Sequence, residues 1–177
     1  MTVACFDLVD AHVVGGHADE EALVDGPTRW SYARLLEEVA AFGGVLGHCG
    51  IVRGDRVVVA LPECVEAVVA VLAAARIGAQ PALGATSAGE KVLVTASTER
   101  DVLRGASAEV VLVRQRRGEE WDLREGRDYD WDVVMRAGRT DPAPCADGAT
   151  LTPTDPRVEA WVDALLSGGA VRVPTEG

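Results

Sequence analysis

The chain has 177 residues and a mass of 18.6 kDa, which is enough for one domain with a substantial core. Hydrophobic residues make up 48% and charged residues 25%, a composition that excludes a chain disordered throughout. Only 17 Lys and Arg stand against 28 Asp and Glu, and the net charge of -11 argues against nucleic acid or an anionic membrane surface as a partner.

In chain order, the first half predicts a short helix, two short strands, a long helix, a buried strand and a second long helix. Ser31 is a good N-cap for the first long helix, whose apolar side chains recur at helical spacing until Gly50 ends it. The unbroken apolar run at 57–61 is typical of a strand buried on both faces. The expected ranges are 6–14, ending at Gly15-Gly16, then 22–25, 28–30, 32–49, 57–61 and 63–77.

The second half begins with three apolar segments and then changes character. Strands are expected over 79–83, 91–95 and 109–114, so strand and helix repeat as in a parallel α/β sheet with right-handed crossovers. The segment 118–132 is charged, 140–156 is rich in Pro, Asp and Thr and is expected to be a loop or linker, and a last helix is expected near 158–166. We therefore divide the chain into an α/β domain at 1–139 and a linker with a C-terminal helix at 140–177.

Reactive side chains are few. Lys91 is the only lysine, so any chemistry that needs an amine must use it. The four cysteines have no C-x-x-C spacing and the three histidines are not clustered with them, so no metal site is expected. The first residues have no basic leader segment, and no apolar run is long enough to span a bilayer. We expect a cytoplasmic protein with free thiols.

Three motifs in order resemble the N-terminal region of adenylate-forming, AMP-binding enzymes. The stretches 30–35, 54–66 and 73–79 are similar to T-Y-x-E-L, G-D-R-V-x-x-x-L-P-N-x-x-E and A-x-x-x-G-A of that superfamily. LVDAHV, AAARIGAQP and WDLREGRDYDWDVVMRAG are similar to segments of the acetyl- and propionyl-CoA synthetases. The resemblance covers about 6–156. It implies a flavodoxin-like parallel sheet flanked by helices, equivalent to one N-terminal subdomain of an acyl-CoA synthetase.

The resemblance also implies what the sequence lacks. In the family, a Ser/Thr/Gly-rich loop ending in P-K-G follows and holds the ATP phosphates. Here Ser167-Gly168-Gly169 follows a predicted helix without a lysine after it, and Lys91 lies at the start of a predicted strand. About one helix is missing between the strands at 79–83 and 91–95, together with the aromatic that stacks on CoA adenine in the family. We expect a truncated, synthetase-like protein that is not a complete acyl-CoA synthetase and has no cofactor.

Four residues are candidates for ligand binding, and no catalytic residue can be named. The resemblance places Arg104, in LRG, where the family has an R-G-G arginine that helps to hold CoA. Asp128, Asp130 and Asp132 alternate with two aromatic residues. Two interpretations stay open for them: a carboxylate site facing a pocket, or a solvated turn whose aromatics cover the core edge. A His48-Cys49 nucleophile pair is a further hypothesis, against a helix-end imidazole beside a buried thiol.

Three functions remain open at this point. The first is a non-catalytic protein of a biosynthetic pathway that binds an acyl-type ligand or another protein. The second is a small enzyme that uses the scaffold for new chemistry, and the third is one fragment of a split acyl-CoA synthetase. In the family this subdomain packs against a similar half. We therefore expect a homo-oligomer or a second protein chain to cover the apolar surface left here.

Overall fold

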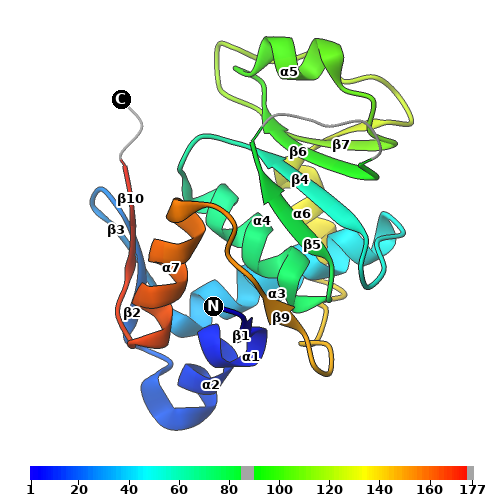
Figure 1. The fold of residues 1–177 in the computed structure, drawn as a ribbon. Coiled ribbons are helices and arrows are strands. Elements are labelled where there is room, and N and C mark those ends of the chain that lie inside the picture. The colour runs from blue at the N-terminus through cyan, green and yellow to red at the C-terminus, as the bar shows by residue number, and fades with distance from the viewer. Residues whose placement is uncertain (85–89, 175–177) are drawn as a thin grey trace.

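The computed structural model describes residues 1–84 and 90–174, and its centre is a five-stranded parallel sheet (Figure 1). The strands run in the order β5-β4-β6-β7-β8. Numbered along the chain this is 2-1-3-4-5, the flavodoxin-like order, which confirms the expected fold class. The strands are β4 (Arg56–Ala60), β5 (Gln80–Leu83), β6 (Val92–Ala96), β7 (Val110–Arg114) and β8 (Asp128–Asp130).

Both faces of this sheet are apolar because the central strands are unbroken runs of aliphatic residues. Every residue of β6 is buried. Along β4 the side chains alternate, so that Val57 and Val59 belong to the main core and Val58 belongs to a smaller cluster on the opposite face. The sequence pattern of a strand buried on both sides is therefore satisfied by helices on both sides.

Three helices cover one face of the sheet and a short one covers the other (Figure 1). α3 (Tyr32–His48), α4 (Val65–Arg76) and α6 (Trp131–Gly138) lie on the main-core side. α5 (Arg100–Gly105) contributes Leu103 to the smaller cluster. As expected, the hydroxyl of Ser31 caps α3, accepting a hydrogen bond from the backbone N–H of Arg34 at 3.3 Å.

Two glycines allow α3 to lie very close to α6 and the segment after it. A Cβ on Gly44 would lie 2.1 Å from the carbonyl oxygen of Asp141, and a Cβ on Gly138 would lie 2.3 Å from that of Ala41. A real Cβ cannot approach an oxygen this closely. The contact between the two helices therefore depends on the absence of side chains at both positions.

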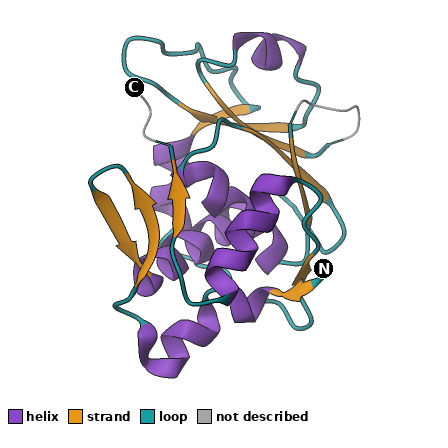
Figure 2. Cartoon of the chain, turned by 60° about the vertical axis from the view of Figure 1, so that its left-hand side comes forward, coloured by secondary structure: helices purple, strands orange, loops and turns teal. Residues whose placement is uncertain are grey.

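A second, smaller sheet joins the two ends of the chain. It has the order β10-β2-β3, in which β10 is parallel to β2 and β2 is antiparallel to β3. Figure 2 shows this sheet and the larger one on opposite sides of the helices. Its strands are β2 (Glu21–Asp25), β3 (Thr28–Ser31) and β10 (Val171–Val173).

The segment expected to be a linker and a helix is built into the rest of the fold. β9 (Thr150–Leu151) pairs with β1 (Val3–Ala4), and α7 (Pro156–Leu166) follows it. Tyr32 donates a hydrogen bond to the carbonyl of Gly169 at 2.8 Å, which fixes the end of α7 against α3. Residues 140–174 therefore contribute two strands and a packed helix.

The first helical segment differs from the prediction. It is divided into α1 (Cys5–Leu8), α2 (Asp10–His12) and the segment η1 (Val13–His17), which is kinked at Gly16. The predicted stop at Gly15-Gly16 is confirmed, because the backbone leaves the helical conformation at Gly16, where φ is 91°. Asp10 and Arg76 form a buried ion pair that holds α2 against α4, and Arg76 also donates to the carbonyl of Ala143 at 3.0 Å.

The expected short connection between β5 and β6 corresponds to residues 84–91, and most of it lies outside the described residues. All four cysteines are free thiols, as expected. Within residues 1–84 and 90–174, no helix is both long enough and apolar enough to cross a membrane.

Candidate functional site

A polar cleft of about 360 Å³ lies at the carboxyl ends of the central strands, where α3, α4 and α6 begin. Open parallel α/β sheets bind ligands outside the carboxyl ends of their strands, so this cleft is the candidate site. The β2–β3 hairpin forms one wall of it, through Asp25, Thr28 and Trp30. Its charged lining residues are Asp25, Arg34, Glu38, Glu66, Arg114, Asp132 and Arg139.

Ion pairs between different elements fix two guanidinium groups in this cleft. Arg114 at the end of β7 lies 2.8 Å from the carboxylate of Glu66 in the first turn of α4. Arg139 after α6 donates to both carboxylate oxygens of Glu38 on α3, at 2.7 and 2.8 Å. Arginine and carboxylate match each other's geometry, so the charged lining is ordered before any ligand arrives.

Two indole rings lie beside these charges, the half-buried Trp30 and the buried Trp131. The guanidinium of Arg34 lies 4.7 Å from the centre of the Trp30 ring, within cation–π distance. Trp131 is stacked on Phe42 with ring centres 4.5 Å apart, which fixes its orientation. The cleft therefore suits a small ligand with a charged or polar group and a short apolar part.

The structure separates the three alternating aspartates. Asp132 lines the cleft, but Asp130 is the N-cap of α6 and accepts a hydrogen bond from the N–H of Val133 at 3.0 Å. Asp128 is buried on β8, the edge strand, and pairs with Arg127. Burial acts to raise the pKa of Asp128, but the Arg127 hydrogen bond and a backbone N–H outweigh it, and the pKa lies below its usual value. Ligand binding by these residues stays a prediction.

Arg104 lies away from the cleft. It is on α5, which lies on the opposite face of the sheet (Figure 1). There it is exposed and forms an ion pair with Asp101 at 3.0 Å. An exposed pair of this kind is easily exchanged for another partner. Its predicted contact with CoA stays a prediction.

The His48-Cys49 hypothesis is not supported by the local geometry. Nδ1 of His48 lies 2.8 Å from the carbonyl oxygen of Gly44, one turn back in its own helix. Burial raises the pKa of the Cys49 thiol, which keeps it protonated and weakly nucleophilic. In the part of the chain that the structure describes, no group of His, Cys, Asp and Glu could hold a metal ion.

The residues compared with a phosphate-binding loop do not fit a nucleotide phosphate. Ser167, Gly168 and Gly169 form the turn that ends α7, and their N–H groups donate to the carbonyls of Asp163, Leu165 and Ala164 at 3.2, 3.0 and 2.9 Å. Lys91, the only lysine, donates to Asp55 at 2.7 Å near the amino ends of the strands. These three N–H groups and the Lys91 amine are therefore engaged by partners within the chain.

Sequence reasoning missed most of the cleft. Of the residues singled out in the sequence as ligand-binding candidates, only Asp132 lines it, and neither Trp30 nor Arg114 was among them. The sequence did contain a usable signal. Arg114 is the last residue of β7, and Glu66 lies in the first turn of the helix that follows β4. Because the carboxyl ends of parallel strands lie at the same edge of a sheet, these two residues are expected to be neighbours. The contribution of Arg139 and Glu38 depends on how α6 packs against α3, and no local pattern shows this.

The fold and the cleft define the class of this protein as a doubly wound parallel α/β domain. Comparison with known families then matches residues 11–161, most of the chain, to the AMP-binding enzymes. The chain belongs to the AMP-binding enzyme family. This confirms the resemblance drawn from the three motifs.

The relatives it matches are much longer proteins. Acetyl-coenzyme A synthetase of Alcanivorax borkumensis is 43% identical over 82 residues, which cover 43% of this chain and 13% of that protein. The enzyme of the same name from Burkholderia mallei is 43% identical over 81 residues, or 12% of its length. The crystal structure of Brucella canis acyl-CoA synthetase superimposes with a TM-score of 0.75 at 20% identity. That match covers 100% of this chain and 44% of the other, and it shows the shared fold.

Proposed function

We propose that these 177 residues act as an acetyl-CoA synthetase-like binding subdomain and do not by themselves activate a carboxylic acid with ATP. The observation that carries the proposal is the turn after α7, where the N–H groups of Ser167, Gly168 and Gly169 all donate to helix carbonyls. Adenylation depends on holding and neutralising a triphosphate. In this chain, the corresponding donors are used to close a helix.

The cleft at the carboxyl ends of the strands is the proposed binding surface for a small acyl-type ligand. It offers the guanidinium of Arg34 and the remaining N–H groups of Arg139 for a polar or anionic end, and the Trp30 ring for a short apolar chain. No step of covalent chemistry is included, because Arg114 and Arg139 are paired with carboxylates rather than placed beside a nucleophile.

The test is a pair of measurements on the purified chain. Calorimetry with Mg-ATP should show no micromolar binding, and pyrophosphate release with acetate or propionate should not exceed the rate without protein. The acetyl-coenzyme A synthetase of Alcanivorax borkumensis serves as the positive control. Micromolar binding of Mg-ATP, or pyrophosphate release by the chain alone, would overturn the proposal.

A split enzyme is a second candidate, favoured by the thin cover over one face of the sheet. On that face α5 has six residues, and Val58, Leu93 and Val111 rely on it and on the half-buried Trp121. These three side chains are already buried, so a second protein chain, or a second copy of this one, would cover α5 and Trp121. Mixing the chain with the remainder of the Alcanivorax borkumensis synthetase tests this: restored acetyl-CoA formation would favour the split enzyme, and an inactive mixture would exclude this pairing.

A further inference from the structure

A second cavity, of about 450 Å³, lies at the opposite edge of the sheet from the cleft. It is formed by the amino ends of β4 and β5, and by β9 with the residues after it, which lie beside β5 (Figure 1). Its polar side chains are Arg53, Arg56, Gln80, Thr150, Thr152 and Thr154. We call it the Arg53 pocket.

The charge of this pocket is opposite to that of the whole protein. No Asp or Glu side chain is among its lining residues, although the chain carries a net charge of -11. Within residues 1–84 and 90–174, neither Arg53 nor Arg56 forms an ion pair, whereas the cleft arginines Arg114 and Arg139 do. The nearest acid in sequence, Asp55, is engaged by Lys91 at 2.7 Å. The pocket therefore presents two guanidinium groups without a carboxylate partner.

One of the two guanidinium groups is held in place by the backbone. Arg53 donates through Nη2 to the carbonyl of Asp147. Its side chain also lies flat against Gly78, where an added Cβ would be 3.2 Å from both Cγ and Cζ of Arg53. A guanidinium has five N–H donors, so this one bond leaves four for a ligand. Ordering before binding reduces the entropy cost of capturing an anion.

Threonine hydroxyls add hydrogen-bonding groups on the other side of the pocket, where that of Thr152 lies 2.8 Å from the hydroxyl of Thr2. Thr150, Thr152 and Thr154 come from β9 and the segment that follows it. Both hydroxyls and guanidinium groups donate hydrogen bonds to oxyanions. Together they offer more hydrogen-bond donors than one carboxylate can accept. Leu151 and Ala82 provide apolar lining beside them.

From this arrangement we infer that the Arg53 pocket binds the phosphoryl group of a small phosphate monoester. Two guanidinium charges match a group that carries about -1.5 to -2 at neutral pH better than they match a carboxylate. The volume exceeds the needs of inorganic phosphate alone, so the organic part lies against Leu151 and Ala82. This site is separate from the cleft and does not depend on the function proposed for the cleft.

The experiment is a calorimetric titration of the full chain, in phosphate-free buffer at fixed ionic strength, with phenyl phosphate, inorganic phosphate and acetate. At that ionic strength phenyl phosphate should bind most tightly. In a second series at higher salt its affinity should be lower, because the contact is electrostatic. Arg53→Gln and Arg56→Gln should each weaken binding about tenfold or more. Arg56→Lys should recover only part of the affinity, because an ammonium lacks the planar fork.

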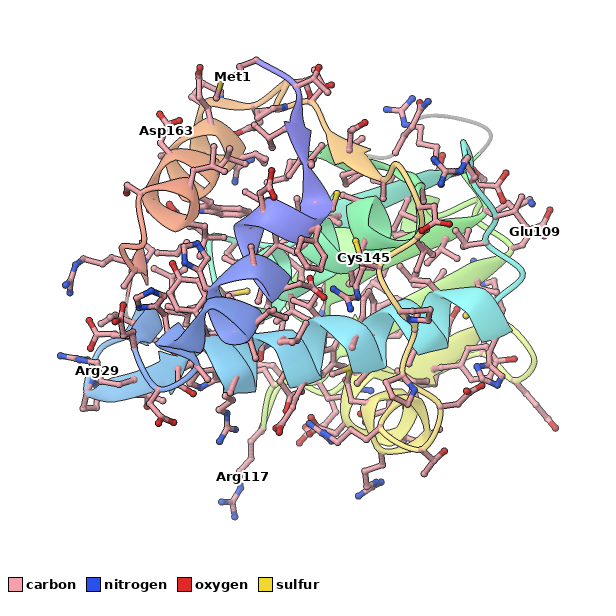
Figure 3. All side chains as sticks on the ribbon, turned by 90° about the horizontal axis from the view of Figure 1, so that it is seen from below. Met1, Arg29, Glu109, Arg117, Cys145 and Asp163 are labelled. Atoms are coloured by element: carbon pink, nitrogen blue, oxygen red, sulfur yellow. The ribbon has the colours of Figure 1, made fainter. Side chains whose placement is uncertain are left out.

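Arg117→Gln is the matched control, since it removes one exposed arginine that points away from the ribbon (Figure 3) and lies outside the pocket. Its phenyl phosphate affinity should equal that of the wild type. Arg56 makes no side-chain bond among the described residues, so Arg56→Gln tests the site even if Arg53→Gln loosens the packing on Gly78. Three results would overturn the inference: no binding at millimolar phenyl phosphate, a phenyl phosphate affinity of Arg56→Gln equal to that of the wild type, or acetate binding as tightly as phenyl phosphate. If inorganic phosphate bound as tightly as phenyl phosphate, the inference that the ligand is an ester would be overturned.

Discussion

The close approach of α3 to the segment after α6 can be tested by adding a single methyl group. In Gly44→Ala the new Cβ would lie 2.1 Å from the carbonyl oxygen of Asp141 and 3.2 Å from its carbon. Carbon and oxygen normally stay more than about 3.3 Å apart, so one backbone must move by about 1 Å. Asp141 cannot move freely, because its N–H donates to Gly138 and the nearby Ala143 N–H donates to Ala40 at 2.8 Å.

The expected magnitude combines two opposing effects. Overpacking in a tight interface costs about 1–3 kcal/mol, whereas replacing helical glycine by alanine returns up to about 1 kcal/mol. The overlap at Gly44 is severe, so we expect the free energy of unfolding to fall by about 1–2 kcal/mol. For a chain of this length that lowers Tm by about 2–8 °C.

Gly47→Ala provides the matched control three residues along the same helix. A Cβ on Gly47 would meet nothing within 4 Å, and the residue is exposed, so only the helix preference applies. This variant should be stabilised by up to about 1 kcal/mol. Urea unfolding followed by tryptophan fluorescence measures both changes. If the two variants shifted stability in the same direction by the same amount, the close contact at Gly44 would be refuted.

Three further outcomes are expected from buried polar groups. Asp10→Asn leaves the guanidinium of Arg76 buried without its carboxylate, and should cost about 3–5 kcal/mol in urea unfolding; a loss near zero would contradict the buried pair. The native pKa of Asp128 is below its usual value, so its stabilisation is complete above about pH 4 and is lost as the pH falls through the native pKa. The stability gap between wild type and Asp128→Asn should therefore be constant down to about pH 4 and then narrow, and a gap independent of pH would contradict this. Burial raises the pKa values of Cys5 and Cys64 to about 12, so Ellman's reagent should label them only after unfolding; rapid native labelling of both would refute their burial.

Much of the α/β framework could be predicted because its signals are local. Ser31 caps α3 as expected, and the aliphatic run that became β4 lies within one residue of its predicted bounds. Gly78, with φ of 82°, ends the turn after α4 in a conformation that suits glycine. In these elements, propensity, periodicity and capping agree with the tertiary packing.

The elements that were missed are stabilised by contacts between distant residues. β8 is a three-residue edge strand of charged sequence, and it forms because Val111 and its neighbours on β7 supply the hydrogen bonds. β10 has only three residues, and it becomes a strand by pairing with β2. The charged cleft was missed for the same reason, since its ion pairs join α3 to α6 and α4 to β7.

The pairing of β10 with β2 has a consequence for biosynthesis. The β2–β3 hairpin leaves the ribosome early, but its parallel partner Val171–Val173 is made only after α7. A two-stranded hairpin is marginally stable in water, and an unpaired strand edge is a template for association with other chains. During translation, the β2–β3 hairpin therefore waits for β10 to complete its sheet. In that interval the unpaired edge of β2 is open to pairing with other chains.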